Sequence, residues 1–156
     1  MAAVAVNDLW VRYGRTAAVR GVSFTVDEGS VLGLVGESGS GKSTVARAIV
    51  GLTPATGAVR VAGVDLLSSS SRPARLARRR VQLVFQDSRS SLDPRFSVEQ
   101  CVMEGLDRSA YRSRREASAR VAELLELVSL DPSVALSRPG NLSGGQRQRV
   151  AIARAL

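Results

Sequence analysis

Short apolar runs separated by glycine and polar turns divide the first part of the chain. Residues 4–11 alternate roughly between apolar and polar positions, which predicts a strand, and a second strand is expected over residues 19–26. Residues 31–35 and 81–85 are continuous apolar runs, typical of buried strands in a sheet covered on both faces. Residues 58–62 predict a further short strand between two glycines.

In the first part of the chain, helical patterns alternate with these predicted strands, and in the later part only helical patterns remain. Residues 43–50 predict a helix that Gly51 and Pro54 close. Serine-rich residues 68–71, followed by Arg72-Pro73, indicate a surface loop. From about residue 97 the pattern is helical, and one apolar stripe predicts an amphipathic helix that packs in a core. The stripe consists of Ala117, Val121, Leu124, Leu125 and Val128.

The last segment, residues 146–156, also predicts a helix. No glycine, asparagine or proline closes it, so we expect the sequence to stop within an element.

Composition favours one compact domain. The chain has 156 residues, of which 44% are hydrophobic. No apolar run approaches the roughly 20 residues that a membrane helix needs, and the first residues lack the pattern of a secretory signal. Cys101 is the only cysteine, so no internal disulfide can form. We therefore expect a soluble cytoplasmic protein.

The net charge is +8 and comes almost entirely from arginine. Of 22 basic residues, 21 are arginine and one, Lys42, is lysine. The arginines cluster at 72–80 and 108–120, where they are interpreted as solvated faces. With only six aromatic residues for base stacking, we expect no nucleic-acid partner. A position that keeps lysine against this bias indicates a need for a compact charge, although chance alone could leave one lysine.

A glycine-rich segment matches the phosphate-loop pattern G-x-x-x-x-G-K-[ST] without a mismatch. Its residues are Gly36, Glu37, Ser38, Gly39, Ser40, Gly41, Lys42 and Ser43. The glycines let backbone N–H groups converge on phosphate oxygens at a helix N-terminus. Lys42 would face the β- and γ-phosphates, Ser43 would bind Mg²⁺, and Thr44 would add a phosphate hydrogen bond. The alternative is a glycine-rich turn with a structural role only.

A second motif follows Leu142: Ser143, Gly144, Gly145 and Gln146. Ser143 and Gln146 have the spacing of a capping box at a helix N-terminus. Glycines are poor helix formers, so two of them in the first turn indicate close approach by another molecule. A plain capped helix is the alternative on these residues alone.

Together the two motifs resemble the ATP-binding cassette (ABC) ATPases, in which the second motif is the signature sequence. The resemblance covers nearly the whole chain. It implies an α/β P-loop NTPase fold of the ABC type, with an antiparallel β part and a helical subdomain, truncated before the Walker B strand. The implied parts of domain 1–156 are a nucleotide-binding core at 1–96, a helical subdomain at 97–140, and the signature with its helix at 141–156.

The resemblance also assigns roles to single residues. Tyr13 matches the aromatic residue that stacks on adenine, with an ordinary strand aromatic as the alternative. Gln86 matches the Q-loop glutamine, which touches Mg²⁺ and water and faces the membrane subunits. Lys42 and Gln86 would be catalytic, Ser43 and Gln86 would bind the metal, and ATP and Mg²⁺ are the implied cofactors. ATP would lie between two cassettes, with the phosphate loop of one facing residues 143–146 of the other.

A narrower resemblance is to the importers of oligopeptides, dipeptides and nickel, carried by residues 36–44, 85–87 and 91–95. Asp93 departs from the asparagine common in that group, and Gly140-Asn141 replaces the usual His-Glu. The implied partners are a second ABC ATPase subunit in a homo- or heterodimer, transmembrane permease subunits and, indirectly, a solute-binding protein. The implied location is the cytoplasmic face of the cell membrane, as a peripheral subunit.

Parts of the family's catalytic set are missing from this sequence. The family places an aspartate, a water-orienting glutamate and a histidine after the signature, and this chain contains no histidine. We expect nucleotide binding without normal turnover, and open apolar surface beside residues 31–35. The alternatives are a non-catalytic nucleotide-binding fragment and an ABC ATPase of DNA repair or translation. The transported solute is not encoded here, because specificity lies in the membrane and binding proteins.

Overall fold

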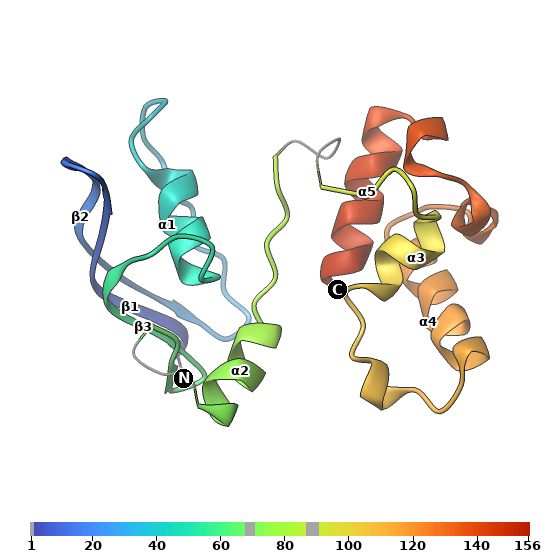
Figure 1. Cartoon of the computed structure of the whole chain (residues 1–156), viewed down its shortest axis with the longest axis horizontal. Helices are drawn as coiled ribbons and strands as arrows, with labels where there is room; N and C mark the ends of the chain where they lie inside the picture. The colour runs from blue at the N-terminus through green and yellow to red at the C-terminus, as the bar shows by residue number, and fades with distance from the viewer. Residues whose placement is uncertain (1, 68–70, 87–90) are drawn as a thin grey trace. The chain divides into compact units, whose positions relative to one another are not determined.

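The computed structural model describes residues 2–67, 71–86 and 91–156 (Figure 1). It divides into two compact units, Met1–Leu83 and Val84–Leu156. The first unit contains a sheet and two helices, and the second is helical. Within the described parts of the chain, no helix has the length and apolar character needed to cross a bilayer.

An antiparallel four-stranded sheet forms the first unit, in the order β2-β1-β3-β4. Its strands are β1 (Ala2–Tyr13), β2 (Thr16–Asp27), β3 (Thr56–Val61) and β4 (Val64–Asp65). The first two strands form a hairpin in which Tyr13 pairs with Thr16. The strands expected at 4–11, 19–26 and 58–62 are confirmed.

A bulge in β1 explains why its apolar alternation is only approximate. Val6, Leu9 and Val11 are almost fully buried, so the spacing of inward positions is three and then two. The register of β1 shifts against both neighbours in this stretch, and Asp8 there has φ +47°. The Asp8 N–H donates to Ser23 Oγ at 2.9 Å. This extra residue turns Leu9 back into the core.

Helix α1 (Lys42–Ile49) covers the sheet and contacts β1 and β2. Its buried residues Val45 and Ala48 join a core made with Val6, Leu9 and Val59. The helix expected at 43–50 is therefore confirmed, and its apolar face packs it on the sheet.

Helix α2 (Arg72–Arg79) corrects the surface loop expected over 68–73. Ser71 Oγ accepts a hydrogen bond from the Ala74 N–H at 3.4 Å and begins the helix. Pro73 lies in the first turn, where its missing N–H has no helical partner to lose. Residues 68–70 of the expected loop lie outside the described residues.

The strands expected at residues 31–35 and 81–85 are wrong, because neither segment has regular secondary structure. Val31 is 98% exposed and Val35 is 96% exposed. No strand among the described residues pairs with either segment. A strand gains its backbone hydrogen bonds only from a neighbouring strand, so an apolar run without one does not form a ladder.

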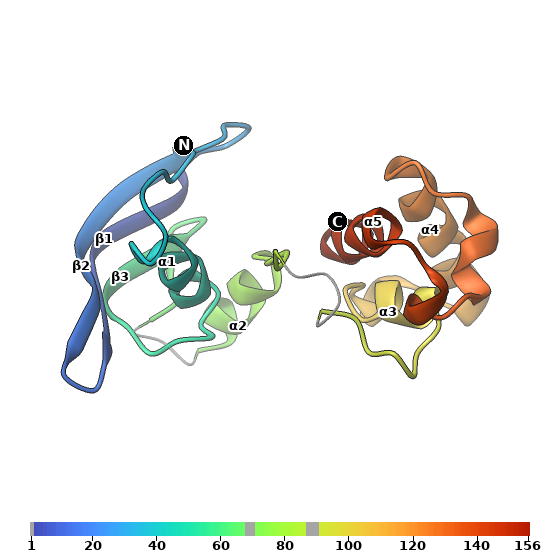
Figure 2. The same cartoon turned by 90° about the horizontal axis from the view of Figure 1, so that it is seen from above.

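The second unit packs three helices around one core: α3 (Val98–Met103), α4 (Arg114–Leu127) and α5 (Gly144–Ala155). Single 3₁₀ turns connect them: η1 (Arg108–Ala110), η2 (Pro132–Leu136) and η3 (Pro139–Asn141). Helix α5 contacts both α3 and α4, and Figure 2 shows α5 and α4 above α3 in this view. Val121, Leu124 and Leu125 are buried as the apolar stripe predicted. The helical character from residue 97 and the last helix are both confirmed.

Candidate functional site

The phosphate-loop motif, residues 36–43, leads directly into α1 (Figure 1). A turn inside it is closed by the Ser40 N–H, which donates to Glu37 O at 3.2 Å. Gly41 is the N-cap of α1, and its carbonyl accepts the first helical hydrogen bond from the Val45 N–H at 2.9 Å. The motif therefore stands where the sequence predicts it, at the N-terminus of a helix.

Gly41 cannot carry a side chain without strain. Its φ is +96°, in the left-handed region that glycine adopts freely. A Cβ at this position would lie 2.7 Å from the carbonyl oxygen of Ala18 in β2. Gly39 is also left-handed, at φ +82°. The loop thus needs two of its glycines for its backbone path, whether or not a ligand is bound.

Lys42 folds back over the loop that precedes it. Its Nζ donates to Gly36 O at 2.9 Å, to Glu37 O at 2.7 Å and to Ser40 Oγ at 3.3 Å. The ammonium group is held by neutral oxygens only, so its charge is not cancelled locally. A positive charge inside a loop of backbone groups is suited to an anion.

The start of α1 adds to this preference for an anion. No side chain caps the helix, and its first turn contains no acidic residue. Uncapped N–H groups at a helix N-terminus attract negative charge. Ser43 is exposed at this end and Thr44 is half-buried, so the Ser43 hydroxyl remains accessible. The donors fit a phosphate group better than a neutral ligand.

Tyr13 belongs to the same unit as the phosphate loop and lies at the end of β1. Its side chain is 51% exposed, and its hydroxyl lies 3.5 Å from Oγ1 of Thr53, a buried residue shortly after α1. This contact holds the phenol against the segment that follows α1, while half of the residue stays accessible. Such a ring is available for stacking on a flat ligand.

The second motif forms the N-terminus of α5. Ser143 Oγ accepts from the Gln146 N–H at 3.2 Å, and Gln146 Oε1 accepts from the Ser143 N–H at 2.8 Å. The predicted capping box is confirmed. A Cβ at Gly144 or Gly145 would meet no atom within 4 Å, and neither glycine has a positive φ. The chain itself therefore does not require these two glycines, which leaves an open backbone surface for another molecule.

Arg147 fixes the approach to this motif. Its Nη1 donates to Leu142 O at 2.5 Å and to Pro139 O at 3.3 Å, so the turn η3 is bound to the helix that follows it.

Gln86 lies in the same unit as this motif and is exposed. Its neighbour Asp87 lies outside the described residues. The structure thus unites Tyr13 with residues 36–44, and Gln86 with residues 143–146, in separate units.

Residues 91–95 form a rigid segment whose partners the sequence did not reveal. The Arg95 guanidinium donates three hydrogen bonds to the carboxylate of Asp93, with the shortest at 2.7 Å, and its backbone N–H donates a fourth; these bonds lower the pKa of Asp93 to about 2. Arg154 Nη1, at the end of α5, donates to Ser91 O at 2.6 Å. Burial raises the pKa of the Cys101 thiol, which lies 3.8 Å from Asp93 O. The contact between Arg154 and Ser91 joins residues 63 apart, so it leaves no local pattern in the sequence.

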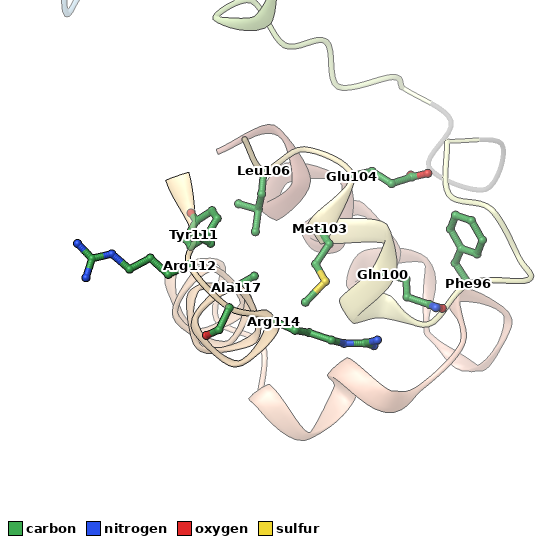
Figure 3. Close-up of a pocket in the computed structure, with 10 residues that line it drawn as sticks. Phe96, Gln100, Met103, Glu104, Leu106, Tyr111, Arg112, Arg114 and Ala117 are labelled. Carbon is green, nitrogen blue, oxygen red and sulfur yellow. The ribbon is translucent and has the colours of Figure 1, made fainter. Parts of the chain in front are cut away.

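A pocket with a volume of about 610 Å³ opens beside α3 in the second unit. Figure 3 shows Met103 and Leu106 directed into it and Arg114 beside Met103, whereas Arg112 extends away from the other labelled side chains. The lining residues are Phe96, Gln100, Met103, Glu104, Leu106, Tyr111, Arg112, Ser113, Arg114 and Ala117. None of them belongs to either nucleotide motif, and the sequence analysis gave them no role. An apolar interior with a polar margin is typical of a binding surface.

Among the described residues, no group of three or more His, Cys, Asp or Glu side chains lies close enough to hold a metal ion. Magnesium sites often use few protein ligands and complete their coordination with phosphate oxygens and water. The Ser43 hydroxyl beside the phosphate loop fits that kind of site. A protein-only metal centre finds no support in this part of the chain.

A phosphate loop that leads into a helix without a side-chain cap, beside an antiparallel sheet, together with a serine-capped helix whose first turn contains two glycines, is the combination expected of an ATP-binding cassette. The ABC transporter family model matches residues 19–156, and the chain belongs to this family. Its fold is that of an ABC ATPase cassette, with an antiparallel sheet and several helices.

Relatives with known names are ATP-binding proteins of peptide import. A putative peptide import ATP-binding protein of Brucella abortus is 50% identical over 145 residues, which cover 89% of this chain and 42% of the relative. The oligopeptide transport ATP-binding protein OppD of Mycobacterium tuberculosis is 44% identical over 144 residues, covering 92% of this chain and 23% of OppD. The chain thus spans less than half the length of these relatives.

Solved structures agree with the family. The dimeric structure of MJ0796, a bacterial ABC transporter cassette, matches with a TM-score of 0.85 and 32% identity, over 98% of this chain and 68% of that one. A dimeric post-hydrolysis state of the same cassette, bound to ADP and Pi, matches with a TM-score of 0.84, 32% identity and the same coverage.

Proposed function

We propose that this chain is the nucleotide-binding part of an ABC importer ATPase that couples ATP to peptide uptake. The uncapped N-terminus of α1, with Lys42 folded over its loop, is the observation that carries the proposal. The family and the post-hydrolysis cassette bound to ADP and Pi support ATP as the ligand. The names of the relatives support peptides as the solute.

ATP binding begins with the exchange of Lys42's partners. The ammonium leaves the carbonyls of Gly36 and Glu37 and meets the β- and γ-phosphates, while the loop N–H groups bind the remaining oxygens. Tyr13 stacks on the adenine. Mg²⁺ would neutralise charge on the phosphates and would be held by Ser43, and the family resemblance assigns Gln86 a contact with the same ion. Each of these roles follows from the family resemblance together with the exposure of the residue.

The signature residues act on the ATP of a second cassette. Gly144 and Gly145 leave an open backbone surface at the N-terminus of α5, and Ser143 stands beside them as the cap. A γ-phosphate docked there would meet N–H groups and the positive end of a helix. Dimeric structures of a similar cassette support this arrangement, which needs either two copies or a related subunit.

We assign the pocket beside α3 to a permease segment at the cytoplasmic face of the membrane. It lies in the same unit as Gln86 and the signature, so a segment bound there would contact the unit that contains both elements. Met103 and Leu106 offer apolar contact, and Arg112 and Arg114 offer charge at the margin. Met103→Glu should weaken co-purification with the permease while nucleotide affinity stays unchanged.

Nucleotide titration separates this function from its alternatives. The purified chain should bind ATP more tightly than AMP, because the loop recognises the outer phosphates. A phosphate-release assay should then find little turnover by this chain beside a version joined to the C-terminal part of a full-length peptide-import relative. Comparable turnover by both would contradict the missing-residue argument, and equal affinity for ATP and AMP would contradict the phosphate-loop assignment. ATP binding without turnover by either version would favour a non-catalytic nucleotide-binding module.

A further inference from the structure

Helix α2 presents a basic stripe that the proposed function does not use. Positions 72, 75, 76, 79 and 80 recur at helical spacing, and all five are exposed. We call Arg72, Arg75, Leu76, Arg79 and Arg80 the α2 basic stripe. Arg80 is the C-cap of the helix and continues the stripe at its end. Four guanidinium groups therefore surround one leucine.

The opposite side of α2 fixes the direction of this stripe. Ala74 and Ala77 are buried, and Arg78 donates to the carbonyl of Leu66. Helix α2 contacts β4 through this side. Small buried residues allow the helix to lie close to the unit, so it cannot turn its arginines inward without losing that packing. The stripe is a fixed outer surface of the first unit.

Among the described residues, none of the ion pairs involves an arginine of the α2 basic stripe. No acidic residue occurs between Asp65 and Asp87 in the sequence. The three ion pairs among the described residues all lie in the second unit, at Asp93–Arg95, Glu99–Arg114 and Arg120–Glu123. The first turn of α2 has no acidic residue either. Such a surface is suited to an anionic partner.

We propose that the α2 basic stripe binds an anionic phospholipid surface directly. Guanidinium groups pair well with phosphate oxygens, and arginine is weakly hydrated for a cation. Leu76 is 52% exposed at the centre of the stripe, where an apolar side chain can enter the headgroup layer between the arginines. Nucleic acid would not use this leucine, and the stripe contains no aromatic residue for stacking on bases.

The lipid contact differs from attachment through a permease, because it needs no other protein. This inference depends on the proposed function in one respect only, because that function places the chain near a membrane. The strength of the lipid contact should fall steeply with salt, since exposed charges are screened beyond about 10 Å at 0.1 M salt.

Vesicle flotation tests the inference with the full chain, and it separates bound protein from aggregates. One set of vesicles contains phosphatidylcholine alone, and the other contains equal parts of phosphatidylcholine and phosphatidylglycerol. The test variant replaces the four stripe arginines with glutamine: Arg72→Gln, Arg75→Gln, Arg79→Gln and Arg80→Gln. The control variant makes the same change at four scattered, exposed arginines: Arg15→Gln, Arg20→Gln, Arg60→Gln and Arg115→Gln. Both have a net charge of +4, because four charges are removed from +8.

The unaltered chain should float with the anionic vesicles and not with the neutral ones. Each arginine at such a surface strengthens binding roughly fivefold at low salt, so the stripe variant should bind at least about 30-fold more weakly. The scattered control should stay within about threefold of the unaltered chain. Leu76→Ser should remove most of the binding that persists at about 0.5 M salt, where charge contributes little.

Equal weakening in the two quadruple variants would overturn the proposal, because net charge alone would then explain binding. Preference for double-stranded DNA over anionic vesicles, lost in the stripe variant, would also overturn it and assign the surface to nucleic acid. ATP titration of every variant keeps the two proposals separate. Vesicle binding without ATP affinity would contradict the proposed function alone, and normal ATP affinity without vesicle binding would contradict the lipid contact alone.

Discussion

Lys42→Ala should weaken ATP binding strongly, and the contacts of Lys42 indicate how much. The ammonium is held by three neutral oxygens at 2.7–3.3 Å, none of which compensates its charge. On binding, it exchanges these neutral acceptors for phosphate oxygens. A charge-assisted hydrogen bond contributes about 1.5–3 kcal/mol. Loss of that contact corresponds to a dissociation constant about 10- to 150-fold higher.

An exposed arginine is the matched control for this prediction. Arg75→Ala removes the same unit of charge from the same structural unit, but an exposed charge contributes less than about 1 kcal/mol. Its effect on ATP affinity should therefore stay within about fivefold. Isothermal titration with ATP, ADP and AMP distinguishes local contact from general charge. The loss in Lys42→Ala should be largest for ATP and smallest for AMP.

Two results would refute this reasoning. Equal effects of Lys42→Ala and Arg75→Ala would mean that the loop is not the phosphate site. A loss of equal size for ATP and AMP would mean that Lys42 supports only the shape of the loop, through its bonds to Gly36 and Glu37. Chemical denaturation of both variants, measured in parallel, establishes that each is folded.

Three further predictions concern stability and reactivity. Gly41→Ala should lower the free energy of unfolding by about 1–3 kcal/mol in urea titration, because φ of Gly41 is +96° and the new Cβ would collide with Ala18 O. Gly51→Ala is the control: Gly51 is also left-handed but has open space around it, so this change should cost less. The pKa of Asp93 is lowered from 3.8 to about 2, so the Asp93–Arg95 pair stabilises the fold above the unfolded value and loses this effect as the pH falls toward 2. Asp93→Asn should therefore cost much less stability at pH 2 than at pH 6, by thermal melts; an equal cost at both would contradict the ionic explanation. Cys101, buried and with a raised pKa, should react with iodoacetamide at pH 8 only after urea unfolds the chain, and rapid native labelling would contradict its burial.

Local patterns in the sequence determined both nucleotide motifs. The phosphate loop was predictable because its turn depends on glycine at left-handed positions, such as Gly39 and Gly41, and on the helix that follows directly. The capping box of Ser143 and Gln146 was predictable because its hydrogen bonds join residues three apart. The stripe on α4 was predictable for the same reason, since helical spacing repeats within a few residues.

Elements that depend on distant neighbours were not predictable. Residues 31–35 have the composition of a buried strand, but a strand exists only where another strand supplies its hydrogen bonds, and no described strand does so. The bulge at Asp8 appears only when β1 is paired with its neighbours, because the register shift is a property of the pair. The run of serine before Arg72-Pro73 suggested a loop, yet Ser71 begins α2, whose alanines pack on the unit.

The candidate site also combines features that the sequence determined with features that only the tertiary structure decided. The sequence alone predicts which residues would meet phosphate, because the loop and the start of its helix bring the proposed donors together within residues 36–44. Only the tertiary structure decided that Gly41 passes against Ala18, that Tyr13 lies beside Thr53, and that α2 turns its arginines outward. The physical reason is the range of the interactions involved. Caps and turns close within a few residues, whereas packing and strand pairing join residues that the sequence keeps far apart.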